Sequence, residues 1–236
     1  AYEISLGLVG SEMCIRDRYR DINGVNEVRI YSDKFFVISK YDTKNKTFIS
    51  TKGGMYSWDN GYYEILEFNS SDSTSVGDTV YYSNVKINIK NDSVKMVIDG
   101  VKFNKYPHDD NLSGAWLMSG IERRGEMRMR DVTRPRKTLK MLAGGRFQWI
   151  AYDTSKKGFY GTGGGTFTAV DGKYIENIEF FSRDSNTVGK SLEFDYEIKE
   201  GDWQHAIRTP ISNDFTLTPR KLTAKPRTIQ NNNIGN

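Results

Sequence analysis

The sequence predicts an all-β protein made of two tandem antiparallel barrels of about eight strands each. Two observations lead to this prediction: an internal repeat with a period of about 110 residues, and an apolar/polar alternation with a period of two inside each copy. Such alternation is typical of strands that bury one face and expose the other. Short antiparallel strands of this kind are expected to close into barrels, because closure removes exposed strand edges.

The repeat begins with a Tyr-Asp-Thr segment, which occurs at 41–43 and again at 152–154. Two neighbouring glycines follow at matching distances, at 53–54 and 164–165. Further identical pairs occur along both copies: Lys46 and Lys157, Phe48 and Phe159, Thr51 and Thr162, Glu64 and Glu176, Glu67 and Glu179, Phe68 and Phe180, Asp72 and Asp184, Val76 and Val188. So many matches in one register indicate a tandem duplication.

The strands are expected where the alternation is regular and turn residues flank it. In the first copy these segments are 27–31, 34–41, 47–51, 62–69, 85–90 and 94–98. In the second copy they are 112–119, 138–142, 147–152, 159–162, 174–181 and 191–199. Residues 123–130 carry so many charges that we expect a solvated loop there. The glycine-rich stretches at 53–54 and 161–165 are expected to form a strand bulge, since the second lacks the Gly-Lys-Ser/Thr that completes a phosphate loop.

The repeat also sets the expected domain boundaries. We expect a first barrel over 21–104, a linker over 105–111, a second barrel over 112–205, and a basic, disordered tail over 206–236. Residues 1–20 are expected not to be native, because the segment 11–18 (SEMCIRDR) resembles a translated sequencing adaptor, and no signal peptide is visible. The alternative is that residues 3–9 form the first strand. Residues 214–217 are the only candidate for the strand that closes the second barrel.

Charge and composition exclude several classes of protein. The formal net charge is +4, and the tail from residue 206 onward supplies all of it through five basic residues and one acidic residue. No run approaches the roughly 18 apolar residues of a membrane-spanning helix, so no integral membrane segment is expected. The single cysteine, Cys14, excludes an intramolecular disulfide and a multi-cysteine metal site. We expect no cofactor, no metal and no nucleic-acid partner.

The second copy opens with Leu-Ser-Gly-Ala-Trp at 112–116, which contains a Gly-x-Trp motif. This motif, placed before a meander of about eight strands, resembles the first strand of lipocalin-like (calycin-type) barrels. Residues 23–205 as a whole resemble lipocalin-like secreted proteins of unknown function from Bacteroidota. The resemblance implies a barrel that binds a small molecule and is exported to the periplasm or the cell exterior. The first copy lacks the motif.

Glu64 and Glu176 are the candidates for a polar group inside each barrel. Each lies on one strand face with apolar residues at the next alternate positions. If that face lines the barrel, each carboxylate is buried, and a buried carboxylate is either a ligand anchor or a general acid. The alternative is that both are solvated or paired with a Lys or Arg of a neighbouring strand. Glu67 and Glu179 lie three positions further on, on the opposite face, and cannot complete an acid/base pair with them.

The aromatic residues at matching positions are candidates for the lining of the barrels, with core packing as the alternative. The expected ligand-binding residues are Phe147, Trp149, Glu176 and Phe180 in the second barrel and Phe36, Glu64 and Phe68 in the first. Arg128 and Arg130 are placed at the mouth of the second barrel, inside a run with eight basic and two acidic residues between 123 and 140. This run favours an anionic ligand, and a solvated basic loop is its alternative.

These features favour non-catalytic binding of a small apolar, amphipathic or glycan-like molecule in a barrel interior. One alternative is a glycan- or lipid-active enzyme that uses a buried glutamate as acid or base. Another is a structural or interaction module whose barrels are filled by their own side chains. The two histidines, His108 and His205, occupy unmatched positions, and no Gly-x-Ser-x-Gly segment is present, so a Ser-His-Asp hydrolase is not expected.

Overall fold

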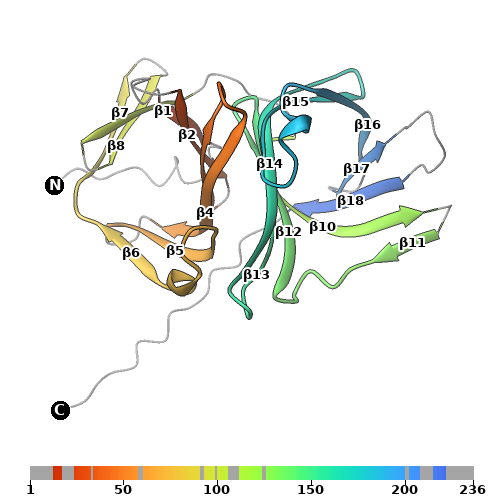
Figure 1. The fold of residues 1–236 in the computed structure, drawn as a ribbon, viewed down its shortest axis with the longest axis horizontal. Coiled ribbons are helices and arrows are strands. Elements are labelled where there is room, and N and C mark those ends of the chain that lie inside the picture. The colour runs from red at the N-terminus through yellow and green to blue at the C-terminus, as the bar shows by residue number, and fades with distance from the viewer. Residues whose placement is uncertain are drawn as a thin grey trace, which may run out of the picture.

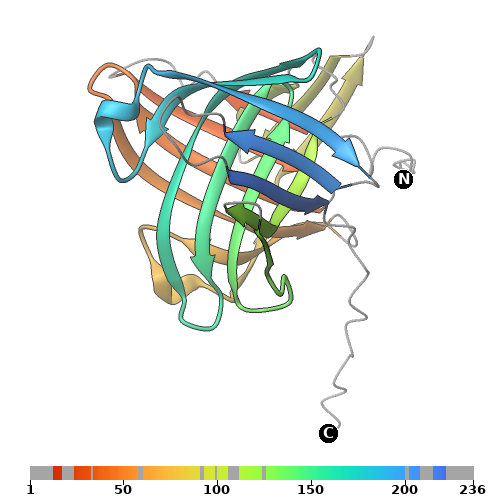
Figure 2. The ribbon, with the colours of Figure 1, turned by 90° about the vertical axis from the view of Figure 1, so that its right-hand side faces the viewer.

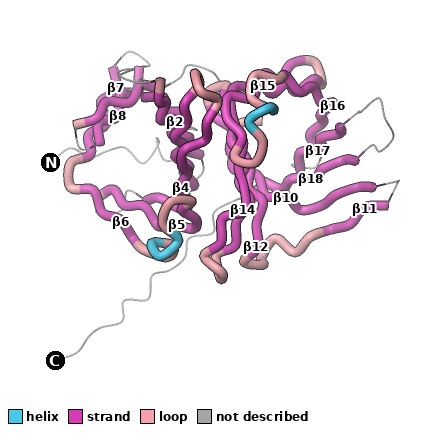
Figure 3. The backbone as a smooth tube through the Cα atoms, viewed as in Figure 1, coloured by secondary structure: helices cyan, strands magenta, loops and turns pink. Residues whose placement is uncertain are grey.

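The computed structural model confirms the all-β prediction (Figure 1). It describes residues 13–17, 24–32, 34–57, 61–90, 93–98, 100–105, 112–123, 126–199, 202–207 and 215–221. Within these residues the only helices are two short 3-10 turns, η2 (Ser73–Ser75) and η3 (Ser185–Thr187), and all strand pairs are antiparallel (Figure 3).

The first unit is a curled nine-stranded sheet with the strand order β6-β5-β4-β3-β2-β1-β9-β8-β7. Its strands are β1 (Met13–Asp17), β2 (Val25–Ser32), β3 (Phe35–Asp42), β4 (Thr47–Ser57), β5 (Tyr62–Asn69), β6 (Thr79–Tyr82), β7 (Val85–Lys90), β8 (Ser93–Ile98) and β9 (Val101–Lys105). The two strands at the ends of this order, β6 and β7, are separated in the chain only by Ser83 and Asn84. The ends of the sheet are thus connected by a very short segment.

The second unit is also a nine-stranded sheet, with the order β11-β10-β12-β13-β14-β15-β16-β17-β18. Its strands are β10 (Gly114–Arg123), β11 (Glu126–Met129), β12 (Arg136–Ala143), β13 (Arg146–Asp153), β14 (Gly158–Val170), β15 (Lys173–Phe181), β16 (Ser191–Lys199), β17 (Asp202–Ile207) and β18 (Phe215–Lys221). In addition, β10 pairs with β18, which joins the first long strand of this unit to the last.

Five strands lie where the sequence pattern predicts none, namely β1, β6, β9, β11 and β17. β1 lies in the segment that resembles an adaptor, where it pairs with β2 and β9. β11 lies in the expected loop, and β6, β9 and β17 lie in segments for which no strand is expected. β18 overlaps the candidate closing strand 214–217 and continues to residue 221 within the expected tail. These strands are held by backbone pairing to a neighbour, which requires no alternation of side chains. The alternative first strand, 3–9, and the segment 105–111 apart from Lys105 lie outside the described residues.

The two sheets lie side by side (Figures 1 and 2). They pack against each other through one apolar cluster, which we call the shared cluster. Its buried residues come from both units: Val28, Ile30, Phe35, Val37, Tyr41, Phe68, Ala115, Leu117, Leu139, Met141, Ala143, Ile150, Tyr152 and Phe180. Each unit also has a cluster of its own, which contains Phe36 and Tyr62 in the first unit and Phe147 and Tyr174 in the second. We call the faces that carry these separate clusters the interior faces. Strands such as β3 are therefore buried on both faces.

The glycine pairs form the predicted bulges. The register shifts between Gly53 and Gly54 where β4 meets β5, and between Gly164 and Gly165 where β14 meets β15. The bulge adds one residue to the partner strand and reverses its alternation from there on. As a result, Phe68 and Phe180 point into the shared cluster, whereas Leu66 and Ile178 belong to the interior clusters.

The bulge geometry predicts that Gly165→Ala is more destabilising than Gly77→Ala. A Cβ on Gly165 would lie 1.9 Å from the carbonyl oxygen of Asn177, and the backbone would have to move, at a cost of about 3 kcal/mol. A Cβ on Gly77 meets no atom within 4 Å, so only its φ of +99° opposes the substitution, at about 1 kcal/mol. Urea unfolding measures both values, and equal losses would contradict the assignment of Gly165 to a steric role.

Candidate functional site

The interior face of the second unit carries a buried ion pair between Lys140 and Glu176. β12 directs Leu139 and Met141 into the shared cluster, so Lys140, which lies between them, points to the interior face. There its Nζ donates a hydrogen bond to Oε1 of Glu176 on β15. The side chains are only 15% and 6% exposed, so the pair is largely removed from solvent.

Three aromatic rings surround the ammonium group of Lys140. Its Nζ lies 4.7 Å from the ring centroid of Tyr174, 4.9 Å from that of Trp203 and 5.5 Å from that of Phe147. At these distances the negative face of a ring attracts a cation. The site therefore combines one carboxylate, one ammonium and three ring faces within the interior of a single unit.

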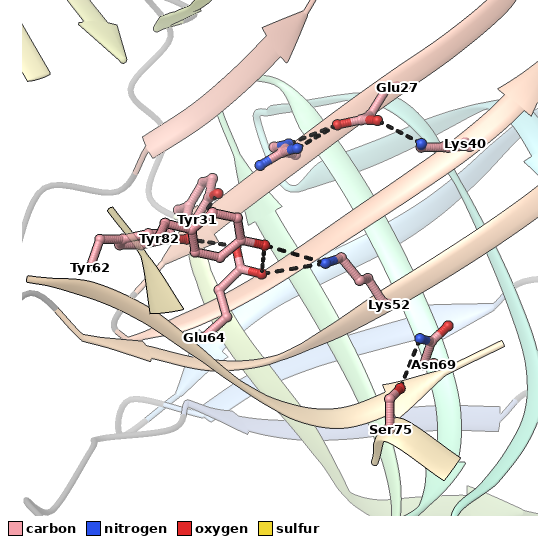
Figure 4. A network of polar contacts seen from close by, with 10 residues as sticks. Glu27, Tyr31, Lys40, Lys52, Tyr62, Glu64, Asn69, Ser75 and Tyr82 are labelled. Carbon is pink, nitrogen blue, oxygen red and sulfur yellow. Dashed lines mark hydrogen bonds and ion pairs between the residues drawn. The ribbon is translucent and has the colours of Figure 1, made fainter. Parts of the chain in front are cut away.

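The interior of the first unit contains a different network around Glu64 (Figure 4). Glu64 is fully buried, and its carboxylate accepts hydrogen bonds from Tyr62 at 2.8 Å and from Tyr82 at 2.9 Å. Lys52 Nζ lies 3.6 Å from the same carboxylate, and the hydroxyls of Tyr62 and Tyr31 are 3.1 Å apart. Burial, together with the charge of Glu64, raises the pKa of Tyr31 to about 12, while Arg29 opposes this shift.

The two matched glutamates thus have different cationic partners. Lys140 has its counterpart in the repeat at Arg29, but the guanidinium of Arg29 donates from Nε to Glu27 at 2.8 Å. Glu27 also lies 3.1 Å from Lys40 (Figure 4). In the first unit the carboxylate is therefore held chiefly by tyrosine hydroxyls, and in the second by a lysine.

The structure brings some of the sequence-predicted residues together. Phe147 belongs to the interior cluster of the second unit and contacts Lys140, which binds Glu176, and Trp149 packs against the same cluster. In the first unit Phe36 belongs to the interior cluster, and Glu64 bonds to Tyr62 of that cluster. The predicted alternative, in which each glutamate pairs with a cation of a neighbouring strand, describes Glu64, which lies next to Lys52 of the adjacent strand β4. It does not describe Glu176, because β13 and β14 lie between β15 and the strand of Lys140.

The other predicted residues lie elsewhere. Phe180 stacks on Tyr41 with ring centroids 4.6 Å apart, and Phe68 lies 4.9 Å from Tyr152, so both belong to the shared cluster and not to the interiors. The bulges cause this, as they reverse the strand alternation on which the prediction depends. Arg128 is on β11 and Arg130 directly follows it, and both are exposed, at the edge of the second sheet.

Several site residues were not predicted, namely Lys140, Tyr174 and Trp203 in the second unit and Lys52, Tyr62 and Tyr82 in the first. Tyr62 and Tyr174 each precede a matched glutamate by two positions, and that spacing could have placed them on the same strand face. Lys140 alternates with Leu139 and Met141, which could have separated it from the exposed basic run. No comparable pattern surrounds Trp203.

Comparison with known proteins adds no family assignment: no protein-family model matches the sequence, and no curated protein matches it. Within the described part of the chain, no helix has the length and apolar character needed to cross a membrane. Among the same residues, no three His, Cys, Asp or Glu side chains gather into a group that could hold a metal ion. Functional conclusions therefore depend on the geometry of the two interiors.

Removing only one member of the buried pair is expected to be costly. Lys140→Met leaves the Glu176 carboxylate buried without its cation, and we expect a loss of about 3 kcal/mol in the free energy of unfolding at neutral pH. The double variant Lys140→Met/Glu176→Leu removes both charges and should recover most of that loss. Urea unfolding of the three proteins provides the test, and a double variant no more stable than the single one would contradict it.

Tyr31 makes the stability of the first unit sensitive to alkaline pH. Above about pH 10 the unfolded chain releases the Tyr31 proton, whereas the folded chain retains it up to about pH 12. The free energy of unfolding should therefore fall as the pH rises from about 10 to about 12, and Tyr31→Phe should reduce this fall. Tyr81→Phe, at a tyrosine that is 76% exposed, is the matched control. The same pH slope in all three proteins would refute the assignment.

Proposed function

We propose that this chain consists of two tandem lipocalin-like barrels of about eight strands each and that it binds a small ligand in the second barrel. The pairing of β10 with β18 supports closure of the second barrel, and the short β6–β7 connection supports closure of the first. The Gly-x-Trp motif lies on β10, where the indole of buried Trp116 donates to the carbonyl of Leu112 at 2.7 Å. Export to the periplasm or the cell exterior, which the resemblance implies, is part of this proposal.

The observation that carries the proposal is the Lys140–Glu176 pair inside a ring of aromatic faces. The ammonium can donate to a ligand hydroxyl, the carboxylate can accept from one, and the rings can cover an apolar ligand face. Because Glu176 already neutralises Lys140, a neutral, hydroxyl-bearing ligand fits better than an anion. A glycan fragment or an amphipathic molecule with a hydroxylated head has this chemistry.

Catalysis is less well supported than binding. A glutamate that acts as general acid or base needs a carboxyl group free to exchange a proton with the substrate. Glu176 is instead engaged with Lys140, and Glu64 accepts from two tyrosine hydroxyls. Both carboxylates are therefore fixed as hydrogen-bond acceptors.

A structural module is the second candidate, and the packing of the second interior favours it. The side chains of Phe147, Tyr174 and Trp203 are each at most 1% exposed. The rings of Trp116 and Trp203 make an edge-to-face contact with their centroids 5.7 Å apart. Side chains packed this closely are typical of a filled core. If the unit is a structural module, the three aromatic side chains around Lys140 stabilise it and bind no ligand.

A thermal-shift screen of the full chain separates the two candidates. We expect oligosaccharides or uncharged hydroxylated amphiphiles such as alkyl glucosides, at millimolar concentration, to raise the melting temperature by several degrees, since a ligand that binds only the folded state stabilises it. Bile acids, which are anions, serve as a comparison class together with fatty acids and haem. Lys140→Met/Glu176→Leu should abolish the shift, whereas Glu64→Gln, the matched change in the first unit, should leave it unchanged. The absence of a shift with every class would favour the structural module.

A further inference from the structure

The contacts between the two units come in reciprocal pairs. The hydroxyl of Tyr41 in the first unit donates to Glu179 Oε2 in the second. In return, the hydroxyl of Tyr152 in the second unit donates to Glu67 Oε2 in the first, at 2.5 Å. Tyr41 matches Tyr152 in the repeat, and Glu67 matches Glu179. The same hydrogen bond is therefore made twice, once in each direction.

Other contacts across the interface show the same reciprocity. The rings of Tyr41 and Phe180 stack with their centroids 4.6 Å apart. The matched residues, Tyr152 and Phe68, have their ring centroids 4.9 Å apart. At the loops, Lys46 Nζ donates to the Val188 carbonyl at 3.4 Å, and the matched Lys157 Nζ donates to the Thr74 carbonyl at 3.0 Å. Both lysines thus reach the 3-10 turn region of the opposite unit.

One residue contacts its own counterpart, and another matched pair shares a hydrogen-bond donor, which locates the symmetry axis. The rings of Phe48 and Phe159 stack with centroids 6.1 Å apart and an angle of 15° between their planes. Thr51 and Thr162 both accept from the side-chain amide of Gln148, at 2.8 and 3.0 Å. In a twofold-symmetric interface, a residue meets its own copy only close to the axis. These two matched pairs therefore mark an approximate twofold axis between the units.

The charges at this interface do not follow the symmetry. Glu179 is held within its own unit by Arg146, which donates to it at 2.8 and 3.2 Å. Glu67 is held across the interface by Lys137, at 3.0 and 3.2 Å. Both cations come from the second unit. In the first unit, Asn26 occupies the position that matches Lys137, and Phe35 occupies the position that matches Arg146. The two glutamates and the two cations balance only when a first unit meets a second unit.

We infer that the face joining the two units is the self-complementary surface of a former homodimer, whose original partner was another copy of the same unit and whose present partner is the other unit of the same chain. Duplication placed both partners in one chain, and divergence of the charges then made unlike units the matched pair. Two first units would bring two glutamates together without these cations. Two second units would carry two cations for each glutamate. This charge pattern disfavours pairing between like units of different chains.

The symmetry makes a specific prediction about Asn26. The backbone of Asn26 pairs with that of Tyr41, just as the backbone of Lys137 pairs with that of Tyr152. Because Tyr41 reaches Glu179 as Tyr152 reaches Glu67, a lysine at position 26 should place its ammonium at Glu179. Asn26→Lys in the first unit should therefore replace the function of Arg146 in the second unit.

The test uses four variants of the full chain: Arg146→Met, Lys137→Met, and each of these combined with Asn26→Lys. We expect both single variants to lower the melting temperature, and we expect Asn26→Lys to recover at least half of the loss caused by Arg146→Met but none of the loss caused by Lys137→Met. If Arg146→Met does not fold, the readout is recovery of folded, soluble protein by Asn26→Lys. Rescue of neither variant, or equal rescue of both, would overturn the inference.

A second measurement tests whether the surface holds the units together without the covalent link. A protease site introduced within residues 106–111 allows the folded protein to be cut between the units. We expect the cut protein to elute as one particle with the mass of the intact chain, as measured by light scattering at micromolar concentration. Separation of the two fragments would show that the linker, and not a homodimer-type surface, keeps the units paired.

Discussion

The face-to-face packing of the two sheets through the shared cluster is the constraint on which the rest of the structure depends. It requires β3, β12 and β13 to be buried on both faces, one against the other unit and one against their own interior. Charged groups on these strands then lack free access to water and need partners. Arg146, which is 3% exposed, bonds to Glu179, and Lys140 bonds to Glu176. Both buried ion pairs follow from the burial of these strands.

The glycine bulges allow one strand to place apolar side chains both on the interior face and in the shared cluster. Before the bulge, β15 directs Glu176 and Ile178 to the interior, and after it Phe180 points to the other unit. Gly164 makes this possible, because a Cβ there would lie 2.6 Å from both the Phe147 carbonyl and the Phe180 ring. The glycine bulge of each unit therefore connects the interior face to the interface along one strand.

The all-β class and most strands could be predicted from the sequence, because the alternation of apolar and polar residues is a local signal. The sequence did not allow β1, β6, β9, β11 or β17 to be predicted, since these strands have only four to six residues and are stabilised by pairing to neighbours. Glu64 and Glu176 were found because they recur in both copies. Their partners were missed because the position that matches Lys52 is Gly163, and because Lys140 lies on a strand that is not adjacent to β15. The face on which each lysine lies also depends on which side of its sheet meets the other unit.

The two interiors hold carboxylates at matching sequence positions, Glu64 and Glu176, with different partners. In the first unit Lys52 on β4 approaches Glu64, but the matched position in the second unit is Gly163. A Cβ at Gly163 would lie 2.7 Å from both the Trp149 indole nitrogen and the Phe181 ring, so the space beside β14 is occupied by these two aromatic side chains. With no side chain on β14 to supply a cation, Glu176 pairs with Lys140 from β12. That exchange replaces a tyrosine-held carboxylate by an ion pair enclosed in aromatic rings, which has the donor, the acceptor and the apolar faces that a small hydroxylated molecule requires.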